Sequence, residues 1–429
     1  MRKLIISKVG PISTTIKVLF RRYCVLIGPQ SNGKSTIAKI LSTCLWMEKE
    51  ACTSLSNEVL PKGWTFKQFI ESFHRMHGYI NEHNSYIQYE SEFVSIIYDK
   101  GNFSLNIKDT DHYKRVKISY IPSDRNIVTM KDIEKRDLEP TNFRSFLFDW
   151  LECNRNFDSE HKAEILNLGV KYYYDANAKD RKDKIVHQNG VTYDIPLYDA
   201  SSGMQSVVPM IVTMKYLSTM YFENYGKNTS FEQEQKKRML TSKLLMKYLK
   251  REHPTQSYND IYQNMIKNSN KGDEQAAKKV RDIYEEFNRL INPNSISYII
   301  EEPEQNLFPQ TQVDLVKEMF AICESSHKGA VLITTHSPYI LAAVNILLFA
   351  GQLQKKGLDK QPLKEVIGTD TLLNPEEVSI YSVHDGKCDS IIDSSTGLIM
   401  QNKLDAASEY NAAIFDKLYK MYIKFLRKS

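Results

Sequence analysis

The residues with the clearest chemistry form a glycine-rich loop near the start of the chain. They follow the pattern G-x-x-x-x-G-K-S, and the loop positions are Gly28, Pro29, Gln30, Ser31, Asn32, Gly33, Lys34, Ser35 and Thr36. Glycines at both ends let the backbone curl, so that successive N–H groups point at one anion. In this pattern the lysine reaches the β- and γ-phosphates of a nucleotide and the next hydroxyl binds Mg²⁺. The loop therefore predicts a nucleotide site with Lys34 on phosphate and Ser35 on the metal.

The segments on either side of this loop must hold it in place. Residues 23–27 form a short apolar run, which is typical of a buried parallel strand. Apolar residues recur at helical spacing from residue 36 to residue 45. Strand, loop and helix in this order are the context that the motif needs, and the helix N-terminus adds partial positive charge for phosphate.

Two acidic residues end a second apolar run, at 298–300. Glu301 and Glu302 follow it directly. The carboxyl end of a parallel strand delivers such side chains into the ligand crevice of an α/β sheet. One acid can hold Mg²⁺, and the next can polarise the water that attacks the γ-phosphate. The alternative, an acidic loop with no catalytic role, is less favoured beside a phosphate loop.

Two other stretches indicate a function only in combination with the phosphate loop and the two glutamates. His336 follows the apolar run 330–334 and can hydrogen-bond a γ-phosphate, although a single histidine at a strand end is more often structural. Ser202 and Gly203 open a helix and offer a second anion site at its N-terminus. Taken alone, this Ser-Ser-Gly turn would be an ordinary helix cap.

An arginine follows the strand predicted at 116–121 and a proline turn. Arg125 can contact phosphate, tie two lobes of the protein together, or serve as a structural ion-pair partner. The sequence does not choose among these three roles.

Composition limits the class of protein. The chain has 429 residues and a formal net charge of +5, and its apolar and charged fractions are those of an ordinary globular protein. No apolar run is long enough to cross a membrane, and the N-terminus lacks the features of a signal peptide. The six cysteines form no C-x-x-C pair, which favours reduced thiols in a cytoplasmic protein without a zinc site.

The predicted elements divide the chain into three parts. We expect an N-terminal part at 1–213, a helical insertion at 214–293 and a C-terminal part at 294–429 that alternates strand and helix. Within the first part, runs rich in aromatic and β-branched residues predict one antiparallel sheet from strands at 86–89, 93–98, 103–107 and 116–121. Further predictions are a hairpin turn at 188–190, a basic helix at 235–251 and an amphipathic helix at 405–428.

The order of these motifs resembles that of ABC-type ATPase heads in the AAA class, as in RecF, SMC and OLD-family proteins. The shared features are the phosphate loop, Ser-Ser-Gly-x-Gln, Glu-Glu-Pro-Glu and Thr-Thr-His-Ser-Pro. The amino-acid sequences of these motifs are most similar to those in the ATPase subunits of bacterial anti-phage defence systems such as Septu, PARIS and retron-associated systems. The resemblance implies an α/β head with a mainly parallel core sheet, flanking helices, an antiparallel β subdomain and an inserted helical lobe. It does not extend to the middle of the chain.

The resemblance also implies a role for each matching residue. Lys34 and Ser35 would bind ATP and Mg²⁺. Glu301 would be associated with the metal, although the family usually has Asp there. Glu302 would be the catalytic carboxylate and His336 the switch that contacts the γ-phosphate. The expected activity is slow hydrolysis of ATP to ADP and phosphate.

The family pattern further implies an oligomer. Ser202 and Gly203 would face ATP held by a second copy, so that a head-to-head dimer is the smallest complete unit. Met204 replaces the more usual Glu or Lys of this signature, and the Q-loop glutamine has only Gln88 as a candidate.

The implied partner is an effector nuclease. The chain shows no long coiled coil and no nuclease pattern of its own, so an HNH or TOPRIM nuclease would be supplied in trans. DNA remains a possible partner, because the mildly positive net charge is compatible with DNA binding but does not by itself indicate it. The alternatives are a RecF-like DNA-repair ATPase that binds DNA directly and a nucleotide-gated scaffold with little hydrolysis.

Overall fold

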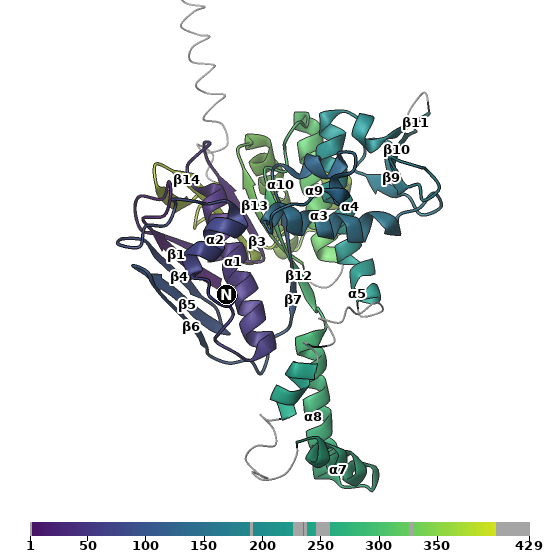
Figure 1. The fold of residues 1–429 in the computed structure, drawn as a ribbon. Helices are drawn as coiled ribbons and strands as arrows, with labels where there is room; N and C mark the ends of the chain where they lie inside the picture. Colours follow the sequence, from purple (N-terminus) through teal and green to yellow (C-terminus); the bar gives the residue numbers. More distant parts are fainter. Residues whose placement is uncertain are drawn as a thin grey trace, which may run out of the picture.

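The computed structural model describes residues 2–188, 192–225, 235, 238–245, 258–325 and 329–399. The predicted hairpin turn at 188–190 and the basic helix at 235–251 lie partly outside these residues, and the helix at 405–428 lies wholly outside them. The described chain builds three sheets with helices packed between and around them (Figure 1). The predicted α/β class with a mainly parallel core sheet is therefore confirmed.

A six-stranded sheet forms the centre of the molecule. Its order is β15-β14-β3-β13-β12-β7. The bounds are β15 (Lys387–Ser390), β14 (Val378–His384), β3 (Tyr23–Ile27), β13 (Ala330–Thr335), β12 (Ser295–Glu301) and β7 (Val116–Ile121). All neighbours are parallel except the edge strand β15, which runs antiparallel to β14. The three apolar runs near the predicted site are thus β3, β13 and β12, side by side.

The other two sheets are antiparallel. One has the order β2-β1-β4-β5-β6 and the other β11-β10-β9-β8. The first comprises β2 (Ile16–Phe20), β1 (Arg2–Ser7), β4 (Tyr86–Glu90), β5 (Val94–Asp99) and β6 (Asn102–Ile107). The second comprises β11 (Tyr193–Pro196), β10 (Asp183–His187), β9 (Val170–Tyr174) and β8 (Ala163–Ile165).

The prediction for residues 116–121 was wrong in one respect. They form a strand, but β7 pairs in parallel with β12 in the central sheet and does not join the antiparallel strands before it. The strand ends in Ser119, Tyr120 and Ile121, all of which are buried. Burial on both faces is typical of a parallel sheet, whereas the alternation seen in β5 is typical of an antiparallel sheet with one open face.

The helices cover both faces of the central sheet. The bounds are α1 (Lys34–Ser54), α2 (Phe66–His74), α3 (Asn142–Cys153), α4 (Ser202–Ser218), α5 (Met220–Asn224), α7 (Tyr258–Asn270), α8 (Glu274–Ile291), α9 (Pro309–Ser325), α10 (Pro338–Lys355) and α11 (Lys360–Ile367). One core contains α1 and the five-stranded sheet, and the other contains α3, α4, α9 and α10. In Figure 1, α7 and the far end of α8 project away from the sheets.

Successive residues of the core strands point into these two different cores. Ile299 belongs to the core on the α1 side, and Ile300 belongs to the core on the α4 side. By the same alternation Glu301 faces α1. This face carries the phosphate loop, because α1 begins at Lys34.

Two further observations concern the predicted organisation. Helix α4 runs through residue 213, so the predicted boundary there falls within a helix, and the three-part division stays a prediction. In the described ranges, no helix is both long and apolar enough to span a membrane.

Candidate nucleotide site

The phosphate loop connects β3 to α1 and lies against β14. Gly28 has no room for a side chain, because a Cβ there would lie 1.9 Å from the Val383 carbonyl oxygen. Gly33 has a φ of 101°, which side-chain-bearing residues rarely adopt. The Asn32 side chain accepts a hydrogen bond from the Asp385 backbone N–H at 2.8 Å. The last parallel strand and the turn after it therefore form one wall of the loop.

Lys34 occupies the centre of the loop. Its Nζ donates to the carbonyl oxygens of Gly28 and Pro29, both at 2.7 Å, and lies 3.2 Å from Nδ1 of His336. Burial lowers the pKa of the Lys34 ammonium to about 8, although the nearby carboxylates of Glu302 and Glu304 act in the opposite direction. A polyphosphate beside Nζ would restore the electrostatic support that burial removes.

Glu302 and His336 meet at the carboxyl ends of β12 and β13. His336 Nε2 lies 2.9 Å from Oε1 of Glu302, whose Oε2 accepts from the Gln305 amide at 3.0 Å. Glu302 has a φ of 44°, an unfavourable value for a residue with a side chain, and its N–H donates to the Thr334 carbonyl. The structure thus brings Lys34, His336 and Glu302 together from three separate motifs.

Glu304 is a residue of the site that the sequence analysis did not assign. Its Oε1 accepts from the His336 backbone N–H and from the Thr335 hydroxyl, both at 2.7 Å. Glu304 therefore fixes the backbone that carries His336. The signal was present as the fourth residue of Glu-Glu-Pro-Glu, but only the folded chain shows which group it contacts.

Glu301 fits a metal ligand. The residue is buried near the Tyr120 hydroxyl, and its Oε1 has no partner within hydrogen-bond geometry. A buried carboxylate oxygen without a partner is costly unless a cation or donor satisfies it. Glu301 faces α1, whose first turn carries Ser35. Mg²⁺ in nucleotide sites takes one or two protein oxygens together with phosphate oxygens and water, so these two residues are a sufficient donor set.

No larger metal cluster competes with this assignment in the part of the chain that the structure describes. No group of three or more His, Cys, Asp or Glu side chains there could hold an ion. The six cysteines are free, and five of them are buried.

The predicted signature lies on the other side of the acidic loop. Ser202 and Gly203 form the first turn of α4, where the Ser201 hydroxyl accepts from the Met204 N–H at 3.5 Å. A Cβ on Gly203 would lie 2.8 Å from the Asn306 carbonyl oxygen. Among the described hydrogen bonds, none joins Ser202 or Gly203 to the phosphate loop. Within one chain, the signature therefore contacts the segment after Glu302 and not Lys34.

Arg125 connects these two sides. Its guanidinium is fully buried and donates only to backbone carbonyls. The acceptors are Pro122 (3.2 Å), Glu301 (2.8 Å), Glu302 (2.9 Å), Pro303 (3.3 Å) and, in the first turns of α4, Ser206 (3.0 Å). Burial lowers the pKa of Arg125 to about 10, which leaves it charged at neutral pH. Of the three roles left open by the sequence, the contacts favour the one that ties two parts of the protein together.

Gln88 does not reach the site. It lies on β4 in the five-stranded sheet, where its side chain accepts from the Tyr86 hydroxyl and donates to Glu90. These contacts within one strand hold it away from the phosphate loop, so the structure does not support it as the Q-loop residue.

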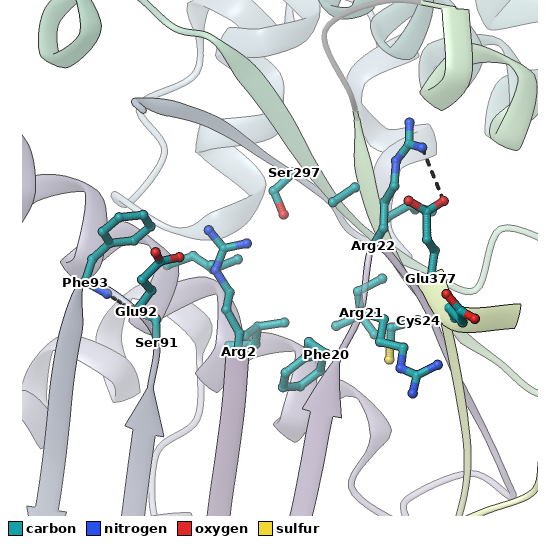
Figure 2. Close-up of a pocket in the computed structure, with 16 residues that line it drawn as sticks. Arg2, Phe20, Arg21, Arg22, Cys24, Ser91, Glu92, Phe93, Ser297 and Glu377 are labelled. Carbon is teal, nitrogen blue, oxygen red and sulfur yellow. Dashed lines mark hydrogen bonds and ion pairs between the residues drawn. The ribbon is translucent and has the colours of Figure 1, made fainter. Parts of the chain in front are cut away.

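A cavity of about 580 Å³ lies at the opposite, amino edge of the central sheet (Figure 2). Arg2, Arg22 and Ser297 are among its lining residues, and none of the predicted site residues is. Its cations already have partners, because Arg2 pairs with Glu48, Arg22 pairs with Glu324, and Arg21 donates to the Pro375 carbonyl. This cavity does not belong to the nucleotide site.

The cage around Arg125 gives a first prediction. Replacing Arg125 with alanine leaves several buried carbonyl oxygens without donors, so we expect the free energy of unfolding to fall by about 3 kcal/mol or more. Denaturant titration measures this. The matched control is Arg75→Ala, which removes an exposed pair with Asp124 at 3.0 Å and should cost no more than about 1 kcal/mol. Equal losses in the two variants would contradict the role of the cage.

Comparison with known proteins finds one matching family model. Residues 283–341 match an AAA ATPase domain, and the match includes Glu301, Glu302 and His336 but not the phosphate loop. It supports an ATPase domain in this chain. No curated protein sequence matches the chain.

Several solved structures are similar at low identity. The SMC head domain from Thermotoga maritima is 10% identical, with a TM-score of 0.38, over 91% of this chain and 97% of that one. The Smc head domain from Pyrococcus furiosus is 10% identical, with a TM-score of 0.37, over 96% and 100%. A structure of the recombination mediator RecF is 9% identical, with a TM-score of 0.29, over 91% and 97%. The strand order described above, and not these distant likenesses, defines the fold of this chain.

Proposed function

We propose that this chain is an ABC-type ATPase head that binds ATP with Mg²⁺ and hydrolyses it slowly. One observation carries the proposal. Lys34 of the phosphate loop lies 3.2 Å from His336, and His336 lies 2.9 Å from Glu302. Three motifs that are far apart in the sequence thus meet in one continuous set of contacts. The AAA ATPase match over residues 283–341 supports the same reading.

Each residue of the site would have a separate role in binding and hydrolysing ATP. Lys34 and the N–H groups of the loop bind the phosphates, and Glu302 accepts a proton from the attacking water. His336 lies between them, where it can sense the terminal phosphate. Glu301 and Ser35 would hold Mg²⁺, which when bound neutralises charge on the phosphate oxygens.

Two features support slow hydrolysis. Both carboxylate oxygens of Glu302 already have partners, His336 and Gln305, so only part of the four lone-pair positions of this carboxylate is open to an attacking water. Glu301 also has one methylene more than the aspartate usual in the resembling family. The same features would suit a nucleotide-gated scaffold, in which hydrolysis is negligible.

The position of the signature supports a dimer. Gly203 packs against Asn306 in the acidic loop of its own chain, and no described hydrogen bond joins Ser202 or Gly203 to the phosphate loop. We propose that they face the nucleotide of a second copy, which gives a head-to-head dimer with two shared sites.

The wider role rests on the resemblance of the motifs. We propose that nucleotide-dependent assembly controls an effector nuclease of HNH or TOPRIM type, supplied in trans, in defence against phage. Nuclease activity that appears only when the partner, this chain and ATP are combined would support this role. Salt-sensitive DNA binding by this chain alone would instead favour a RecF-like repair function.

The shifted pKa of Lys34 gives a prediction for nucleotide affinity. The ammonium form binds phosphate, and its pKa of about 8 in the free protein means that this form is lost as the pH rises above 8. We expect the affinity for ATP to fall by up to about tenfold per pH unit from there. Titration calorimetry between pH 7.5 and pH 9.5, values chosen to bracket this pKa, would measure it. The control is Lys34→Arg, which stays charged, and a parallel decline in that variant would rule out Lys34 as the cause.

Replacement of Glu302 with Gln tests the catalytic assignment and the dimer together. The amide cannot accept a proton, so phosphate release should fall by about a hundredfold or more while ATP still binds. Light scattering should show a dimer or larger assembly that forms only with ATP. Lys34→Ala, which loses the phosphate contact, should remain unchanged in mass. If the mass of Glu302→Gln does not respond to ATP, the shared-site model is wrong.

A further inference from the structure

The cavity at the amino edge of the central sheet has the size of a small-molecule site. Its volume is about 580 Å³, and ligand sites are clefts of about 300–1,000 Å³ that combine apolar walls with a few placed polar groups. It lies between the end of the five-stranded sheet and the amino ends of β3, β13 and β12 (Figure 2). The nucleotide site lies at the other ends of these three strands, so the two sites do not overlap.

The walls of the cavity are largely apolar. The apolar side chains that line it include Phe20, Leu41, Leu45, Phe93 and Leu332. All of them belong to the core on the α1 side, where Phe93 is partly buried and the others are buried. An apolar or aromatic group that entered the cavity would leave water and lie against these side chains, which is favourable.

Arg2 brings a positive charge into this apolar space. Its Nη2 donates to one carboxylate, that of Glu48 on α1, at 3.1 Å. This bond uses one of the five N–H donors that a guanidinium carries. Among the described residues, neither Nε nor Nη1 has a hydrogen-bond partner, and the side chain is 29% exposed. Arg2 can therefore bind a second anionic group while it keeps Glu48.

Ser297 adds a hydroxyl group beside this cation. The residue lies on β12, is only 8% exposed and lines the cavity. Among the described hydrogen bonds, none involves its hydroxyl, although buried polar groups normally have partners. Figure 2 shows Ser297 and the Arg2 guanidinium pointing into the same space. The two side chains are thus placed to donate to one acceptor group.

The remaining charges limit what the acceptor group can be. The other charged residues that line the cavity are Arg21, Arg22, Glu92, Glu376 and Glu377. Together with Arg2 they give equal numbers of arginines and glutamates, and both of the added arginines are already bound to neighbouring groups. A polyanion such as a triphosphate would meet carboxylates that repel it. A single carboxylate needs only Arg2, with which it forms charge-assisted hydrogen bonds.

We propose that this cavity binds a small organic carboxylate with an apolar or aromatic body. The carboxylate accepts hydrogen bonds from Nη1 of Arg2 and from the Ser297 hydroxyl. The body of the ligand lies against Phe20, Phe93 and Leu41. This site is separate from the nucleotide site, so the proposal does not depend on ATP binding or hydrolysis.

The test measures the affinity of the full chain for two probes, phenylacetate and hexanoate, by ligand-observed NMR titration. Each acid should bind at least about tenfold more tightly than its neutral amide, because only the acid forms charge-assisted bonds with Arg2. Inorganic phosphate, which lacks an apolar body, should bind more weakly than either acid. Saturable binding of neither acid at millimolar concentration, or equal binding of acid and amide, would overturn the proposal.

Two variants locate the binding. Ser297→Ala removes a hydroxyl without a protein partner, so the chain should fold normally, and affinity for the acids should fall about threefold or more. Arg2→Lys retains a cation for Glu48 but has no second nitrogen for the ligand, and affinity should fall about tenfold or more.

The matched control is Arg21→Lys, the same change at an arginine of the same cavity that donates to the Pro375 carbonyl. It should alter the affinity by less than about twofold. Circular dichroism checks that each variant is folded. An affinity that is unchanged in both Ser297→Ala and Arg2→Lys would show that the acids bind elsewhere. Equal losses in Arg2→Lys and Arg21→Lys would show a general effect of charge, and either result would reject the site.

Discussion

The arrangement of the site depends on one buried cation. Arg125 has no carboxylate partner among its hydrogen bonds and instead satisfies carbonyl oxygens from three parts of the chain. A guanidinium presents five donors in a fixed plane, so it can hold several backbone segments at set distances. The segments that it joins are the end of β7, the acidic loop after β12 and the first turns of α4. Arg125 therefore fixes the backbone of Glu302 relative to the first turns of α4, in addition to the direct contact of Gly203 with Asn306.

The central sheet provides the second constraint. Because β3, β13 and β12 are parallel neighbours, their carboxyl ends lie at one edge. Each of the three strands delivers one chemical group there: the phosphate loop, His336 and the two glutamates. Glu304 then connects two of these ends by holding the backbone of His336. The contacts between neighbouring strand ends therefore follow from strand order, and strand order is a property of the whole fold.

The sequence predicted the local features well. The phosphate loop, the buried strands and the two glutamates could be identified because each is determined by a few adjacent residues. The sequence did not predict the features that depend on contacts between distant segments, namely strand pairing and side-chain contacts. Residues 116–121 are strand-forming in either sheet, and only the full set of partners determines which sheet they join. The contacts of Arg125 and Glu304 are to backbone groups, which leave no pattern of residue types in the sequence. Gln88 was a candidate for the Q-loop residue only because it is a glutamine. Its place on β4 of the five-stranded sheet gives it other neighbours.

The contact between the phosphate loop and β14 has a consequence for biosynthesis. Gly28 lies against Val383, and Asn32 binds the backbone of Asp385, so residues near the start of the chain need a wall made from residues synthesised more than three hundred positions later. Contacts of such sequence separation form slowly and late. A ribosome must therefore extend the chain past Asp385 before the loop acquires its final shape. A product that ends before Val383 would lack this wall of the loop.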